Sequence, residues 1–166
     1  MSARRARSAF ASATFVAVAG VCTLATADAA PPDWSGPYTV VTFASSKLGT
    51  SIAARQPEPD FSGRYTFTTS CAGTCVATAS DGPAPSNPTI PQPTRYTWDG
   101  QQWVLNYTWQ WECFRGGDVP REYAAARSLV FYAPTSDGSM FGSWRTEILE
   151  GICKGTVIMP VAAYPV

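Results

Sequence analysis

The chain contains no histidine among its 166 residues. This absence excludes a Ser-His-Asp triad, a Cys-His pair and any histidine-ligated zinc or copper site within the chain. Acid–base chemistry near neutral pH would need shifted carboxylates, lysine, tyrosine or cysteine instead. A hydrolase with paired carboxylates stays open as an alternative, because glycosidic bonds are cleaved without histidine. The sequence therefore favours a protein that is not an enzyme.

Charge is also scarce. Charged residues make up 14% of the chain, and the 12 basic and 12 acidic residues cancel to a formal net charge of zero. Such a balance gives no electrostatic footprint for nucleic acid or for an anionic membrane surface. We therefore expect no nucleic-acid partner, and no stable membrane insertion of the mature chain.

The N-terminal segment has the order of a secretory signal peptide. Arg4, Arg5 and Arg7 precede an uncharged stretch over residues 9–27, and Ala27-Asp28-Ala29 follows as a small-x-small cleavage site. We predict that residues 1–29 are removed and that the protein is secreted, either extracellular or associated with the cell wall. A retained anchor is the alternative, because the uncharged stretch approaches the roughly 20 residues of a membrane-spanning helix.

After the signal, no helical periodicity and no internal repeat persist. All 14 prolines lie beyond residue 30, and Asp-Gly turn dipeptides begin at Asp81, Asp99 and Asp137. The strongest pattern lies in residues 102–113, where large apolar residues occupy the odd positions and mostly polar residues the even ones. This alternation is typical of a strand in an antiparallel sheet with one buried face.

The remaining runs of β-forming residues are shorter. We expect strands near Pro37–Phe43, Ser51–Arg55, Arg64–Ser70, Cys75–Ser80, Arg95–Trp98, Arg127–Tyr132, Met140–Leu149 and Gly155–Val161. Together with 102–113 they predict a single all-β domain over residues 30–166, with about 8–9 antiparallel strands. A closed barrel and a two-sheet sandwich both fit this pattern.

One connection differs from the other turns. Residues 82–94 carry Pro83, Pro85, Pro88, Pro91 and Pro93, so this Pro-rich loop should be extended and should stay out of a sheet interior. It could be a stiff spacer between distant strands, or a segment that docks into the groove of a partner. The sequence does not decide between these two roles.

Cysteine usage fits the oxidising compartment that a secreted protein enters. Of five cysteines, Cys22 leaves with the signal. Cys71 and Cys75 flank a short Gly-containing link between two β-like runs, where a hairpin would place them opposite each other. Cys113 and Cys153 share the inward side of their strands, so we favour the pairs Cys71–Cys75 and Cys113–Cys153. The alternative is a four-thiolate metal site; we expect no metal and no cofactor.

Five tryptophans are candidate ligand-binding residues: Trp98, Trp103, Trp109, Trp111 and Trp144. Exposed indoles stack on carbohydrates, and buried ones line apolar sites. The alternative is a strip of core side chains, and a barrel wide enough to enclose a cavity would make both interpretations true. Glu112, Glu147 and Glu150 are the acids that a carboxylate-based hydrolase would use, although a solvated strand face explains them equally well.

The cysteine, tryptophan and glycine positions resemble a known pattern. Its segments are Cys71-x3-Cys75-Val76-Ala77-Thr78, Tyr96-x-Trp98-Asp99-Gly100-x-x-Trp103, Asp137-Gly138-x3-Gly142-x-Trp144-x-Thr146 and Gly151-x-Cys153-x-Gly155-Thr156-Val157. The pattern is similar to that of small secreted mycobacterial proteins of unknown function. It also resembles disulfide-bearing extracellular modules of mycobacterial Ser/Thr kinases. The resemblance implies an envelope or extracellular location, and it assigns no catalytic residue.

These observations predict a secreted, non-enzymatic binding module of the cell envelope or the medium. Its partner would be a small apolar or carbohydrate ligand, or an envelope protein. A β-barrel carrier of an apolar ligand and a histidine-free hydrolase are the alternatives. An apolar void inside the domain would favour the carrier, and two carboxyls converging in a cleft would favour the hydrolase.

Overall fold

The computed structural model describes residues 32–166. The predicted signal peptide, residues 1–29, lies outside the described residues and stays a prediction. Within residues 32–166, no helix combines the length and the apolar character that crossing a membrane requires.

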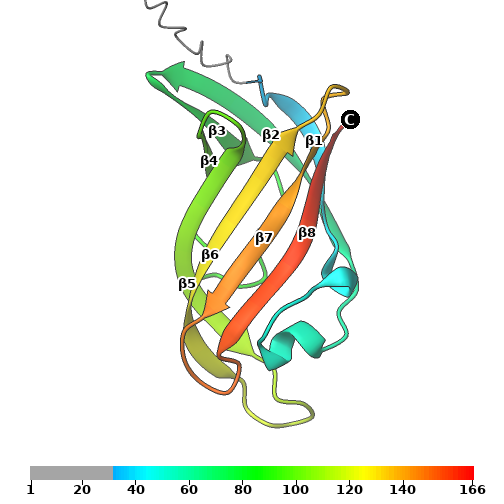
Figure 1. Cartoon of the computed structure of the whole chain (residues 1–166), viewed down its shortest axis with the longest axis vertical. Helices are drawn as coiled ribbons and strands as arrows, with labels where there is room; N and C mark the ends of the chain where they lie inside the picture. Colours follow the sequence, from blue (N-terminus) through cyan, green and yellow to red (C-terminus); the bar gives the residue numbers. More distant parts are fainter. Residues whose placement is uncertain (1–31) are drawn as a thin grey trace, which may run out of the picture.

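Eight antiparallel strands form one closed barrel (Figure 1). The strands are β1 (Gly36–Thr42), β2 (Phe61–Ala72), β3 (Thr74–Ser80), β4 (Arg95–Trp98), β5 (Trp103–Cys113), β6 (Glu122–Pro134), β7 (Met140–Ile148) and β8 (Gly155–Pro165). Each strand pairs with the next, and β8 closes the sheet by pairing with β1 from Thr42↔Val161 to Tyr38↔Pro165. The all-β prediction is confirmed, and closure decides for the barrel over the sandwich.

The alternation in β5 sets which side chains face the barrel interior. Trp103 and Cys113 at its two ends are buried, whereas Asn106, Thr108 and Gln110 are exposed. The same period of two continues into β6, where Ala124, Ala126, Ser128, Val130 and Tyr132 are all buried. A closed sheet therefore keeps one apolar face inside and one polar face outside, as the sequence pattern predicts.

The prediction of a strand over Ser51–Arg55 is wrong. Residues Ile52–Arg55 form a short 3₁₀ helix, η2, because the Ser51 hydroxyl caps its first turn by accepting the Ala53 N–H at 3.1 Å. The same hydroxyl donates to the Cys153 carbonyl oxygen at 2.6 Å, which ties η2 to the turn before β8. A second 3₁₀ helix, η1 (Ala44–Ser46), follows β1. Both helices lie beside the lower end of β8 (Figure 1).

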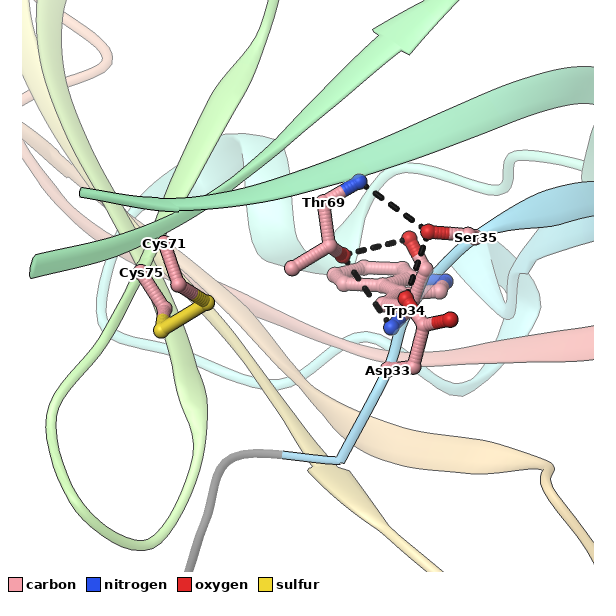
Figure 2. Close-up of a disulfide and its surroundings, with 6 residues drawn as sticks. All are labelled: Asp33, Trp34, Ser35, Thr69, Cys71 and Cys75. Atoms are coloured by element: carbon pink, nitrogen blue, oxygen red, sulfur yellow. Dashed lines mark hydrogen bonds between the residues drawn. A yellow bond between two sulfur atoms is a disulfide. The ribbon is translucent and has the colours of Figure 1, made fainter.

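Disulfides join the described cysteines in the pairing favoured from the sequence. Cys71–Cys75 lies next to the tip of the β2–β3 hairpin, where the two residues are direct register partners (Figure 2). Cys113–Cys153 joins the end of β5 to the turn before β8. Because both sulfur atoms of each pair are consumed, these cysteines supply no thiolate for the alternative metal site.

The segment before β1 is fastened to β2. Thr69 accepts the Trp34 N–H at 3.1 Å and donates its hydroxyl to the Trp34 carbonyl oxygen at 2.9 Å, and its own N–H donates to Ser35 Oγ (Figure 2). These bonds hold the Trp34 indole inside the barrel, where the side chain is fully buried. Trp34 thereby closes the interior at the end that carries the Cys71–Cys75 hairpin.

Candidate functional site

A cavity of about 300 Å³ lies within the barrel, and every one of its eight strands contributes to the wall. This volume is at the lower end of the range for small-molecule sites and has room for roughly ten water molecules. Aromatic rings form much of the wall, among them Phe67, Tyr96, Tyr107, Tyr132 and Trp144. Among the described residues that line the cavity, none carries a formal charge.

An aromatic cluster centred on Trp34 forms one end of the cavity. The Trp34 indole stacks on Phe67 with ring centroids 4.1 Å apart, and it contacts Tyr96 and Tyr132 at 5.0 and 5.1 Å. All three of these partners also line the cavity. Trp34 therefore fixes the positions of rings that a ligand would contact, although it does not line the cavity itself.

Tyrosine side chains contribute to the polar part of this mostly apolar wall, together with Thr42, Ser62, Ser86, Gln92 and Thr94. Burial raises the pKa of Tyr96 and of Tyr132 above the ordinary value, and the charges of neighbouring tyrosines raise both pKa values further. Burial also raises the pKa of Tyr107 to about 12, although the Ser128 and Trp144 side chains act in the opposite direction. The hydroxyls consequently stay protonated at neutral pH and are available as hydrogen-bond donors.

A buried polar group borders the cavity on the side of Trp144. The indole N–H groups of Trp109 and Trp144 both donate to Ser128 Oγ, at 2.9 and 3.1 Å. A serine hydroxyl has two acceptor lone pairs and one proton, so Ser128 must donate its proton to Thr146 Oγ1 at 2.8 Å. This Ser128 network joins β5, β6 and β7 and fixes the Trp144 ring that lines the cavity.

The Pro-rich loop, residues 82–94, forms one side of the cavity. Pro83, Pro85, Ile90 and Gln92 all line it. At the start of the loop, Gly82 packs directly against the Tyr65 ring. The contact is so close that a Cβ atom on residue 82 would lie only 1.9 Å from the ring. The loop is therefore part of the cavity wall, a placement that the sequence did not predict; the two roles weighed from the sequence, spacer and partner-docking segment, stay predictions.

The loop takes this place because β3 and β4 are short. The pairing of β4 with β5 covers only Thr97↔Val104 and Trp98↔Trp103. Farther along β5, loop side chains satisfy the peptide of Gln110: Asn87 Nδ2 donates to its carbonyl oxygen at 2.7 Å, and Thr89 Oγ1 accepts its N–H at 3.0 Å. Asn87 and Thr89 thus replace the neighbouring strand that β5 lacks at this position.

The five candidate tryptophans have different positions. Of these five, Trp144 lines the cavity. Trp98 and Trp103 pack together near Trp34, with ring centroids 5.4 Å apart. Trp109 and Trp111 form a second pair, also at 5.4 Å, towards the other end of the barrel. The candidate set therefore mixes one cavity residue with four packing residues.

Sequence reasoning missed several cavity residues. Tyr65 and Phe67 line the wall from β2, and Trp34 stacks on Phe67, yet none of the three was a candidate. The available signal was the alternation of Tyr65, Phe67 and Thr69 along β2, which places all three on one face of a strand. Enclosure by the Pro-rich loop had no comparable signal.

The carboxylates of the hydrolase alternative are engaged elsewhere. Glu112 accepts a hydrogen bond from Arg121 at 2.5 Å, and Glu147 accepts one from Arg127 at 2.8 Å. Glu150 Oε1 accepts the Ala125 N–H at 3.2 Å. None of these three carboxylates lines the cavity, so each has a structural explanation as a partner of arginine or of the backbone.

The comparisons with known proteins agree with the fold. No protein-family model matches the chain, and no curated protein matches it in sequence. Among solved structures, the chain is similar to the monomer form of the PknI sensor domain of M. tuberculosis, with a TM-score of 0.59 and 19% sequence identity. The match covers 82% of this chain and 90% of that one. The expected resemblance to modules of mycobacterial kinases is thus confirmed at the level of the fold.

Proposed function

We propose that this protein is a secreted, non-enzymatic binding module that takes a small apolar ligand into its barrel. The observation that carries the proposal is the uncharged, aromatic-lined cavity of about 300 Å³. Concave, mostly apolar sites with a few polar groups are the usual form of small-molecule sites. The likeness to a sensor domain supports a role in binding rather than in catalysis.

The mature protein would act in the cell envelope or the medium. The predicted signal peptide and the two disulfides support this location, because disulfides persist in oxidising compartments. A carbohydrate is less well matched, because four of the five candidate tryptophans, Trp98, Trp103, Trp111 and Trp144, belong to or pack against the barrel cores and do not form an open stacking platform.

Native mass spectrometry of the protein purified from its own host tests the proposal. We expect a co-purifying small molecule that is released on denaturation. The variant Val130→Phe should lose it, because Val130 is buried and lines the cavity, so the larger ring fills the space. Val119→Phe is the matched control, since Val119 is exposed and does not line the cavity. An adduct that survives Val130→Phe unchanged would contradict binding in the cavity.

A further inference from the structure

Four tyrosines from four strands meet at the cavity wall. Tyr65 comes from β2, Tyr96 from β4, Tyr107 from β5 and Tyr132 from β6, and all four line the same space. We call them the tyrosine quartet. The Tyr96 and Tyr132 rings are in edge contact, with centroids 5.6 Å apart and planes at 78°. Because the members come from separate strands, their convergence is a property of barrel closure and not of local sequence.

The two most buried members have no protein partner for their hydroxyls. Tyr132 is 2% exposed and Tyr96 is 9% exposed, yet no hydrogen bond within residues 32–166 uses either hydroxyl. By contrast, the Tyr38 hydroxyl, which does not line the cavity, donates to the Gly138 carbonyl oxygen at 3.4 Å. Among residues 32–166, the side-chain polar atoms that are fully buried without a partner are the indole nitrogens of Trp34, Trp98, Trp103 and Trp111. The two tyrosine hydroxyls are not among them, so they reach the open space of the cavity that they line. A polar group held in such a site loses free energy if it stays unpaired. A partner inside the cavity would satisfy both.

The side chains that line the cavity determine which chemical group could pair with these hydroxyls. An ionised group in the cavity would be desolvated with no described counter-charge on the wall, which is strongly unfavourable. A pure hydrocarbon would leave the hydroxyls unpaired. An uncharged oxygen acceptor, such as a carbonyl or an alcohol oxygen, matches protonated phenols because a phenol O–H donates readily to it.

We infer that the ligand is an uncharged molecule with an apolar body and an oxygen-bearing end, and that Tyr96 and Tyr132 hydrogen-bond this oxygen. The inference rests on the proposed function, since it names the ligand class of the same cavity. Phe67, Val130 and Trp144 would contact the apolar body, and the Pro-rich loop would cover it. The size of the cavity restricts the ligand to a small molecule.

Isothermal titration calorimetry of the full chain with four eight-carbon probes tests the inference. The probes are octane, 2-octanone, octanoate and octylammonium at neutral pH. We expect 2-octanone to bind roughly threefold to tenfold more tightly than octane, the effect of one or more net hydrogen bonds. We expect both ions to bind at least about tenfold more weakly than 2-octanone, because of their desolvation.

The double variant Tyr96→Phe/Tyr132→Phe removes the two hydroxyls and keeps the rings. It should abolish the preference for 2-octanone and leave the affinity for octane unchanged within about twofold. Tyr38→Phe is the matched control, because it removes a tyrosine hydroxyl outside the cavity; it should keep the preference. The relative affinities of the unaltered protein for the four probes test the ligand class without any variant. The inference can therefore be tested even if a variant fails to fold.

The failures are distinguishable. If none of the four probes binds, both the proposed function and the ligand class are wrong. If octane binds as tightly as 2-octanone, or if the double variant keeps the preference, the cavity binds apolar molecules but the tyrosine hydroxyls do not select them. Tightest binding of octanoate or octylammonium would overturn the uncharged class.

Discussion

Single hydroxyl groups control the polar contacts inside this barrel. Ser128 is buried and holds two indole N–H groups and the Thr146 hydroxyl on one oxygen atom. The hydroxyls of Tyr96 and Tyr132 instead face a cavity without a protein partner. The first arrangement is satisfied within the protein, whereas the second is satisfied by a ligand or by water. Side chains of similar chemistry therefore differ in their roles, structural for Ser128 and, in the proposal above, ligand-binding for Tyr96 and Tyr132.

Replacing Ser128 with alanine should destabilise the fold. The Trp109 and Trp144 N–H groups would lose their acceptor and Thr146 would lose its donor, so we expect a loss of about 2–4 kcal/mol in the free energy of unfolding. Denaturant unfolding measures it. Ser70→Ala, at an exposed position of β2, should change the stability by less than about 0.5 kcal/mol. Equal, small effects of both changes would contradict a structural role for the Ser128 network.

The buried tyrosines predict a loss of stability at alkaline pH. An unfolded tyrosine ionises near pH 10.0, whereas burial raises the pKa of folded Tyr107 to about 12 and raises those of Tyr96 and Tyr132. Between these values the unfolded chain has released protons that the native chain retains, so the free energy of unfolding falls as pH rises. Denaturant unfolding at about pH 9 and about pH 11 measures this change. A stability that stays constant across this window would contradict the burial of these phenols.

At the scale of elements, the Pro-rich loop completes the barrel wall where strands β3 and β4 end. Its contacts with β5 run through the side chains of Asn87 and Thr89 to one peptide, that of Gln110. A loop held by few hydrogen bonds opens locally more readily than a paired strand. We therefore expect the loop to open more readily than the paired strands of the wall.

The change Thr89→Val tests this attachment. It keeps the shape of the side chain but removes the hydroxyl that accepts the Gln110 N–H and donates to Asn87 Oδ1. We expect amide hydrogen exchange at Gln110 to become roughly threefold to tenfold faster, with the barrel strands unaffected. Thr68→Val, at an exposed position of β2, is the control. Unchanged protection of Gln110 would show that the hydroxyl does not hold the loop.

The strands, 3₁₀ helices and loops differ in how well the sequence predicts them. The alternation over 102–113 predicts β5 and its inward face correctly, because a period of two is a local property of one strand. Residues Ser51–Arg55 carry too short a pattern to reveal that the Ser51 hydroxyl caps a 3₁₀ turn. The role of the Pro-rich loop depends on the lengths of β3 and β4, and so on contacts between distant segments. Trp34 escapes prediction for the same reason, since its partners come from several strands.

At the scale of the whole molecule, the barrel has two cores with the cavity adjoining the first. Trp34 and its aromatic partners form one core. The other contains Cys113, Cys153, Ala44 and Ile148, next to the two 3₁₀ helices. Two disulfides cross-link the fold near its two ends, Cys71–Cys75 with a short sequence separation and Cys113–Cys153 with a long one.

The two disulfides should contribute unequally to stability. Cys113–Cys153 spans a sequence separation of 40, and Cys71–Cys75 spans 4. In the chain-entropy model, removal of the first costs about 4 kcal/mol and removal of the second about 2 kcal/mol. Denaturant unfolding of the two double alanine variants compares these losses. A larger loss for the Cys71–Cys75 pair would contradict the ranking.

The central claim is that a ligand binds inside the barrel, and intermolecular nuclear Overhauser effects between 2-octanone and the methyl groups of the protein test it most directly. The account predicts contacts with the methyl groups of Val130 and Val161, which face the cavity from β6 and β8. Contacts confined to exposed methyl groups such as those of Leu129, on the outer face of β6, would contradict it.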